Sequence, residues 1–288
     1  MKRKSSRILE EPPVTGELKE RALKYFREKA SIYNERYNVR AAGDLLWVRH
    51  EAVLQFVRDW NLPAGARVLD LGCGPGVMTR HLARLGYSGV GLDASRPMIE
   101  DCTKSAEDEG ISHSWSYHLG DVESLPFPDD SFDGAICMGV IDYLSSDDKL
   151  LSEAARVLKP GGRFVLCFTN KFGYAVSLSM PLYLLKKIPG VKSIASRLRS
   201  FFVGGKNGAM EFNFLPRKHR PRVARELMER HGFGAMKDRY VHFTLLPAPF
   251  CILTSKLTMG IDKKLSVLDR TPIRILGSCY ILSNRLER

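Results

Sequence analysis

The sequence predicts an α/β domain built on a doubly wound, mostly parallel β-sheet. Short apolar runs with the composition of strands buried on both faces recur along the chain, at residues 67–71, 88–92, 133–137 and 163–167. Helical stretches separate them, at residues 78–85, 96–109 and 149–158. This alternation of strand and helix indicates a parallel sheet that is covered by helices on both faces.

The chain on either side of this core has a different pattern. Residues 17–59 carry apolar side chains at helical spacing and predict two or three helices. After residue 170 the rhythm changes, and we expect a later helix at 222–231 and strands at 236–246 and 278–284. The chain thus divides into a helical N-terminal region, an α/β core, a basic amphipathic insertion after the fifth strand and a C-terminal region that completes the sheet, at residues 1–60, 61–170, 171–216 and 217–288.

Length and composition limit the class of protein. With 288 residues, 44% of them hydrophobic and 26% charged, the chain can form one large domain with an elaboration, and a disordered or collagen-like protein is excluded. The six cysteines are scattered and contain no CxxC pair, which predicts reduced thiols in the cytoplasm and no metal site. The N-terminus lacks the apolar stretch of a secretory signal, and the apolar runs fall short of the roughly 20 residues that cross a bilayer.

Positive charge is concentrated in the C-terminal part of the chain. The formal net charge of the whole chain is +12. Residues 171–288 hold 22 Lys and Arg against 7 Asp and Glu, so residues 1–170 are slightly acidic. Residues 171–225 alone hold twelve basic residues and one acid. This distribution predicts a surface that attracts an anionic partner.

A glycine-rich turn follows the first predicted strand. Asp70 is followed by Gly72, Gly74 and Gly76, and glycine permits a tight turn and a close approach of a ligand to the backbone. The dinucleotide fingerprint GxGxxG does not fit, because Val77 occupies its third glycine position. An acid in the preceding strand suits a ligand with an amino acid cation better than a pyrophosphate.

Two further carboxylates follow later predicted strands. Asp93 comes 23 residues after Asp70, at a position where a carboxylate accepts both hydroxyl groups of a ribose. Asp121 lies at the next strand end beside the apolar Val122, a pair suited to gripping and covering a purine. Each aspartate alone could be a helix cap. The ordered set instead predicts one site for a nucleoside-containing ligand.

Residues 25–168 resemble the class I S-adenosylmethionine-dependent methyltransferases, a family that includes ubiquinone and menaquinone methyltransferases and many natural-product and lipid enzymes. The resemblance implies a Rossmann-like sheet of seven strands, a helical N-terminal lid and S-adenosylmethionine as the cofactor. It implies that the glycine turn holds the methionine moiety, that Asp93 holds the ribose and that Tyr33 is a lid residue. The implied cofactor-binding residues are Tyr33, Asp70, Gly72, Gly74, Asp93, Ala94, Asp121, Val122, Cys137 and Met138.

The resemblance says less about the methyl acceptor. Asp142 and Tyr143 follow the fourth strand, where related enzymes often line the acceptor pocket, so both are candidates for orienting the acceptor. Core packing is an equal interpretation of Tyr143. His118, His219 and His242 are expected to be structural or exposed. A dedicated general base is not required, because a sulfonium methyl group is already activated.

The insertion is the best indication of the substrate. Residues 175–203 combine apolar and basic residues at helical spacing, which predicts contact with an anionic membrane or an amphipathic lid packed on the domain. We therefore expect a methyltransferase for a small, lipophilic or lipid-linked acceptor, with O-methylation slightly favoured, in the cytoplasm or at the inner face of the membrane. The alternatives are an RNA methyltransferase and a non-catalytic S-adenosylmethionine-binding regulator. A nucleic-acid partner is not expected, and the oligomeric state is left open.

Overall fold

The computed structural model describes residues 16–38, 45–177, 214–243 and 266–288. They form one sheet of seven strands in the order β3-β2-β1-β4-β5-β7-β6. The strands are β1 (Arg67–Leu71), β2 (Ser88–Asp93), β3 (Trp115–Leu119), β4 (Phe132–Met138), β5 (Leu158–Thr169), β6 (Phe233–Val241) and β7 (Cys279–Leu286). The first five are parallel, and β7 is antiparallel to both β5 and β6. The predicted doubly wound, mostly parallel fold is confirmed.

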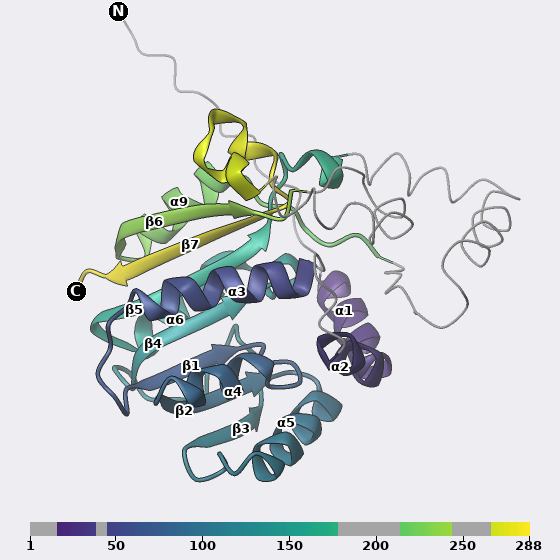
Figure 1. The fold of residues 1–288 in the computed structure, drawn as a ribbon, viewed down its shortest axis with the longest axis vertical. Coiled ribbons are helices and arrows are strands. Elements are labelled where there is room, and N and C mark those ends of the chain that lie inside the picture. Colours follow the sequence, from purple (N-terminus) through teal and green to yellow (C-terminus); the bar gives the residue numbers. More distant parts are fainter. Residues whose placement is uncertain (1–15, 39–44, 178–213, 244–265) are drawn as a thin grey trace, which may run out of the picture.

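Helices cover both faces of this sheet (Figure 1). Neighbouring strand residues point to opposite faces, so Val68 belongs to one hydrophobic core and Leu69 to the other. The first core is closed by α3 (Leu45–Arg58) and α4 (Val77–Arg84), and the second by α6 (Asp147–Val157) and α9 (Pro221–Arg230). Helix α5 (Arg96–Asp108) follows β2. Burial on both faces explains why the strands are almost continuously apolar in the sequence.

Two N-terminal helices lie across the carboxyl ends of the parallel strands (Figure 1). These are α1 (Gly16–Glu28) and α2 (Ala30–Asn38), and with α3 they make three helices in the region where two or three were predicted. Helix α1 is amphipathic: it buries Ala22 and Tyr25, and Phe26 packs against the same cluster. The N-terminal helices therefore form a cover over the sheet edge at which α/β proteins bind ligands.

The end of the fold differs from the prediction in detail. The sequence predicts the fifth strand at residues 163–167, but β5 already begins at Leu158, opposite Phe132. A register shift between Phe132 and Gly134 absorbs the extra residues of β5. The described residues also form short 3-10 helices: η1 (Ile141–Tyr143), η2 (Ser266–Arg270) and η3 (Pro272–Leu276). Within the described residues, no helix has the length and apolar character needed to span a membrane.

Candidate functional site

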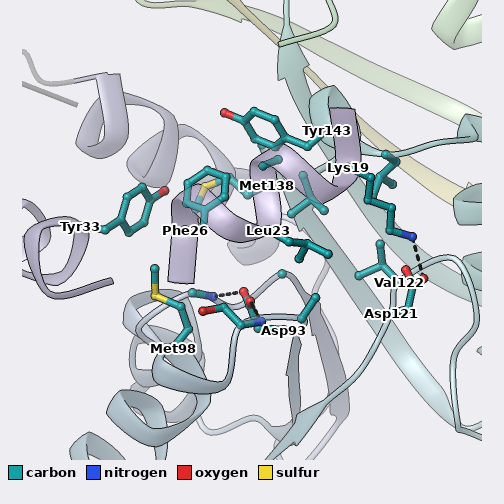
Figure 2. Close-up of a pocket in the computed structure, with 18 residues that line it drawn as sticks. Lys19, Leu23, Phe26, Tyr33, Asp93, Met98, Asp121, Val122, Met138 and Tyr143 are labelled. Atoms are coloured by element: carbon teal, nitrogen blue, oxygen red, sulfur yellow. Dashed lines mark hydrogen bonds and ion pairs between the residues drawn. The ribbon is translucent and has the colours of Figure 1, made fainter. Parts of the chain in front are cut away.

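A cavity lies between the N-terminal helices and the carboxyl ends of β1 to β4 (Figure 2). Eight of the predicted cofactor residues line it: Tyr33, Gly72, Gly74, Asp93, Ala94, Asp121, Val122 and Met138. The other lining residues are Lys19, Ala22, Leu23, Phe26, Ser95, Met98, Gly139, Val140, Tyr143 and Leu144. Asp70, Cys137 and Asp142 are not among the lining residues. The structure thus gathers residues from at least five separate segments at one sheet edge.

The glycine turn is shaped by close packing below it and by open space above it. Gly72 has a φ of 74°, and its amide donates a hydrogen bond of 2.7 Å to the Leu92 carbonyl. A Cβ at Gly72 would lie 2.2 Å from Cγ2 of Val140, so a side chain cannot fit there. Gly74 also has a positive φ, but a Cβ there would meet nothing closer than the Tyr33 ring at 3.8 Å. Among the described residues, only Tyr33 of α2 comes within 4 Å of this position, so the backbone at Gly74 can be approached closely by a ligand.

Asp93 is held rigidly at the end of β2. Its Oδ2 accepts a hydrogen bond of 2.9 Å from the Gly74 amide, and its Oδ1 accepts one of 2.8 Å from the Ser95 amide. Burial raises the pKa of Asp93, although these backbone amides oppose the shift. Each carboxylate oxygen keeps accepting capacity toward the cavity. This geometry fits the pair of hydroxyl groups that the sequence assigned to Asp93.

Asp70 lies beneath the turn, and its side chain is buried. Its Oδ2 has no hydrogen-bond partner among the described residues. Burial, together with the negative charge of Asp93, raises the pKa of Asp70 to about 7. A buried carboxylate with an unpaired oxygen is unfavourable unless a cation or donor approaches it. Asp70 therefore fits a ligand whose cationic group lies near the glycine turn.

Lys19 of α1 binds the carboxylates at the far end of the cavity. Its Nζ lies 2.6 Å from Oδ2 of Asp121 and also contacts Glu123. Burial lowers the pKa of Lys19, but the bonds to both acids outweigh this effect and raise it overall. Sequence reasoning missed Lys19. The signal was its place one turn before Ala22 and two turns before Phe26 on the amphipathic helix α1.

Aromatic rings form the opposite end of the cavity, and Figure 2 shows Phe26 and Tyr33 there, far from Lys19 and Asp121. The Phe26 ring meets the Tyr33 ring edge-on at 5.8 Å between centroids, and it meets the Tyr143 ring at 5.2 Å. Tyr143 thus lies at the cavity and packs within an aromatic cluster at the same time. The two interpretations of Tyr143 from the sequence are compatible.

Asp142 does not have the surroundings of an acceptor-orienting residue. Its side chain is buried, and its Oδ2 accepts hydrogen bonds from the Thr169 amide at 3.1 Å and the Thr169 hydroxyl at 2.7 Å. Its Oδ1 lies 3.1 Å from Nδ1 of His219. The expectation for Asp142 is therefore corrected, because η1 turns the side chain into the protein instead of the cavity. Cys137 is also fully buried, so only its backbone could pass beside a ligand.

His219 contacts both Asp142 and a second acid, and these contacts hold residues 217–219 in place before α9. Its Nε2 lies 3.2 Å from Oδ2 of Asp147. Arg217 binds the other carboxylate oxygen of Asp147, Oδ1, at 2.6 Å. Burial lowers the pKa of His219, but hydrogen bonds to Asp142 and Asp147 outweigh it and raise the pKa to about 9. The Arg217 amide donates to the Asp142 carbonyl at 2.8 Å. These contacts attach residues 217–219 to the 3-10 helix η1, which carries Tyr143.

The fold and this site define a doubly wound nucleotide-binding type of domain, and comparison with known proteins gives its family. The model of the methyltransferase domain family matches residues 69–166. The chain is 35% identical over 158 residues to a demethylmenaquinone methyltransferase of Tropheryma whipplei, covering 51% of this chain and 64% of that protein. It is 32% identical over 150 residues to a ubiquinone biosynthesis O-methyltransferase of Chelativorans sp., covering 50% of this chain and 58% of that protein.

A solved structure supports the fold over a longer stretch. An S-adenosylmethionine-dependent methyltransferase of Thermotoga maritima matches 91% of this chain and 99% of its own, with a TM-score of 0.57 and 17% identity. The chain spans less than two thirds of the length of the curated relatives named above. Residues 69–166 are thus a methyltransferase domain.

Proposed function

We propose that the protein transfers a methyl group from S-adenosylmethionine to a small, lipophilic acceptor, with an oxygen acceptor favoured. The observation that carries this proposal is the cavity that joins the glycine turn, Asp93 and Asp121 under the N-terminal helices. Each of these features alone occurs in other proteins. They follow the ends of β1, β2 and β3, beside the switch point of the sheet between β1 and β4, where open α/β sheets bind ligands.

The residues of the cavity would hold the cofactor in a defined order. Asp121 and Val122 would lie against the adenine, Asp93 against the ribose, and the turn at Gly72 and Gly74 against the methionine moiety. The buried Asp70 would then compensate the positive charge of the amino acid group. S-adenosylmethionine, when bound, supplies an activated methyl group, so the protein has to align the acceptor and exclude water.

The aromatic end of the cavity supports a lipophilic acceptor. Phe26, Tyr33 and Met138 offer apolar surface there, and Lys19 and Asp121 lie at the other end. A planar or aliphatic acceptor would pack on these rings, and a polar group beside Tyr143 would orient it. The names of the two curated relatives, which refer to menaquinone and ubiquinone synthesis, agree with this class of acceptor.

Calorimetry with S-adenosylhomocysteine, the demethylated product, tests the cofactor part of the proposal. We expect the purified full chain to bind this product with an affinity that Asp93→Asn lowers. Absence of binding by correctly folded protein would reject the methyltransferase function. Mass spectrometry of a panel of quinols, phenols and amines incubated with protein and cofactor then tests the acceptor. Methylation confined to water-soluble charged amines would reject the lipophilic class.

The basic C-terminal part of the chain keeps an RNA acceptor as the second candidate. Nuclease treatment of a cell-extract substrate pool separates the two, because methylation of a lipophilic acceptor survives it. A non-catalytic regulator would bind the cofactor and never convert it.

We also propose a place for the protein at the cytoplasmic face of the membrane. The membrane contact expected for residues 175–203 stays a prediction, because residues 178–213 lie outside the described residues.

A further inference from the structure

Exposed apolar side chains gather on one surface of the molecule. The described residues include seven large apolar side chains that are exposed, and five of them belong to this surface: Phe172, Val267, Ile273, Ile275 and Leu276. Val267 is 65% exposed and Ile273 is 51% exposed. We call these five residues the apolar edge surface. A concentration of this kind is typical of an interaction site, since single exposed apolar residues are normally scattered.

Hydrogen bonds hold the parts of this surface together. The Asn170 side chain donates to the carbonyls of Ile275 and Gly277, each at 2.7 Å, and it accepts a hydrogen bond of 3.1 Å from the Phe172 amide. Asn170 is fully buried, so it fixes the end of β5 against η3. The Thr271 hydroxyl donates to the Leu268 carbonyl at 2.8 Å and joins η2 to η3. The surface is therefore a fixed feature of the fold.

The apolar edge surface lies at the same edge of the sheet as the cavity. Strand β5 ends at Thr169 and β6 ends at Val241, while the antiparallel strand β7 begins at Cys279. The Tyr240 amide, near the end of β6, donates to Asp269 of η2 at 2.9 Å. The cavity lies at the carboxyl ends of β1 to β4, so the two features lie at the same end of the parallel strands, with the apolar edge surface displaced along the sheet toward β7 and β6.

Basic residues outnumber acidic ones in the segments around this surface, and Arg217, Arg222 and Arg274 pair with acids outside those segments. The described segments 171–177, 214–222 and 266–276 hold seven Lys and Arg residues and one acid, Asp269. Asp269 is itself bound by Arg239 at 3.1 Å. Arg270 is exposed, and Arg274 lies 5.5 Å above the Tyr240 ring and 3.6 Å from the Asp238 carboxylate. Aliphatic side chains in a basic rim are complementary to an interface with apolar chains and anionic headgroups.

We infer that the apolar edge surface docks on an anionic lipid membrane, so that the carboxyl end of the parallel strands, where the cavity lies, is turned toward the membrane. The aliphatic residues would enter the boundary between headgroups and acyl chains, and the arginines would bind the headgroups. RNA fits less well, because four of the five exposed side chains are aliphatic and offer no face for base stacking. The docking itself follows from the surface alone. Its use, to deliver a lipophilic acceptor, rests on the proposed function.

Vesicle flotation with the full chain tests this inference. The vesicles contain phosphatidylcholine alone or phosphatidylcholine mixed with phosphatidylglycerol. We expect binding to the anionic vesicles, a loss of binding at high salt, and binding weakened about tenfold or more in the double variant Ile273→Glu/Ile275→Glu. Leu85→Glu is the matched control, since Leu85 is an exposed apolar residue at the end of α4, at the opposite edge of the sheet.

Binding of S-adenosylhomocysteine, measured in parallel by calorimetry, reports on folding and on the proposed function. It should be equal in the wild type and in both variants, so a failure of docking is distinguishable from a failure of cofactor binding. No flotation of the wild type would overturn the inference. It would be overturned equally if Leu85→Glu weakened flotation as strongly as the double variant, or if the chain bound an RNA oligonucleotide and ignored the vesicles.

Discussion

The imidazole of His219 and the carboxylate of Asp142 lie 3.1 Å apart inside the protein, although 77 residues separate them in the sequence. Asp142 belongs to the 3-10 helix beside the cavity, and His219 belongs to residues 214–220, which lead into α9 and which we call the return segment. Phe214, from the same segment, meets the Tyr143 ring at 6.1 Å. The position of Tyr143 at the cavity therefore depends on how the return segment is held.

This contact predicts a pH-dependent stability. The pKa of His219 is raised from 6.5 to about 9, so its charged form stabilises the fold fully below pH 6.5, and this contribution is lost as pH rises through about 9. In urea denaturation, the free energy of unfolding of the wild type should exceed that of His219→Gln by about 3 kcal/mol at low pH. This difference should disappear at high pH. His231→Gln is the control, because His231 binds the exposed Asp148. A gap that is independent of pH would contradict the prediction.

Asp70 predicts a pH-dependent affinity for the cofactor product. Its pKa is about 7 in the free protein, and a nearby ammonium group would lower it, so binding requires the loss of a proton below that pH. The affinity for S-adenosylhomocysteine should rise by about tenfold between about pH 6 and pH 8. Calorimetry at both pH values, repeated on Asp70→Asn, checks this. The same rise in the variant would show that another group titrates.

The carboxylate of Asp93 is predicted to carry most of the affinity for the ribose. Asp93→Asn keeps the shape of the side chain but removes the charge, and one acceptor oxygen becomes a donor. We expect the affinity for S-adenosylhomocysteine to fall by roughly tenfold to a hundredfold, the value of one or two charged hydrogen bonds. Asp133→Asn is the control, since Asp133 binds Lys159 at the start of β4, away from the cavity. Equal affinities of both variants would exclude Asp93 from the site.

Lys19 is predicted to hold α1 over the cavity. Lys19→Met keeps the apolar stem but breaks the ion pairs to Asp121 and Glu123. We expect faster amide hydrogen exchange throughout α1 and an affinity for S-adenosylhomocysteine lowered by about tenfold. Lys24→Met on the same helix removes only an exposed pair with Glu28 and should change neither quantity. Unchanged exchange in Lys19→Met would show that apolar packing alone holds α1.

The packing beneath the glycine turn gives a steric prediction. Gly72→Ala places a Cβ 2.2 Å from Val140 and strains a positive φ, so it should lower the free energy of unfolding by about 2 to 4 kcal/mol. Gly110→Ala carries the strain alone, with open space around it, and should cost about 1 kcal/mol. Adding Val140→Ala to Gly72→Ala should recover part of the loss. Thermal or urea denaturation measures the stability of these three variants. If Val140→Ala recovers no stability, the clash of the Gly72→Ala side chain is with a residue other than Val140.

Much of the fold and the cofactor side of the site were predictable because their signals are local. The strand at 67–71, its glycine turn and the acid at 93 each follow from a few neighbouring residues. The roles of Lys19 and Asp142 were not predictable in this way. Lys19 is one of many basic residues until α1 folds across the sheet, and nothing beside Asp142 in the sequence shows that His219 and Thr169 bind it.

The sequence by itself determined that the chain forms a parallel α/β sheet with aspartates at three successive strand ends, because strand periodicity and turn chemistry act over short distances. Only the tertiary structure decided which carboxylates face the cavity, which are neutralised inside the protein, and that five apolar side chains gather at its edge. Burial and pairing depend on segments far apart in the chain, and the free energy of a charge depends on what surrounds it.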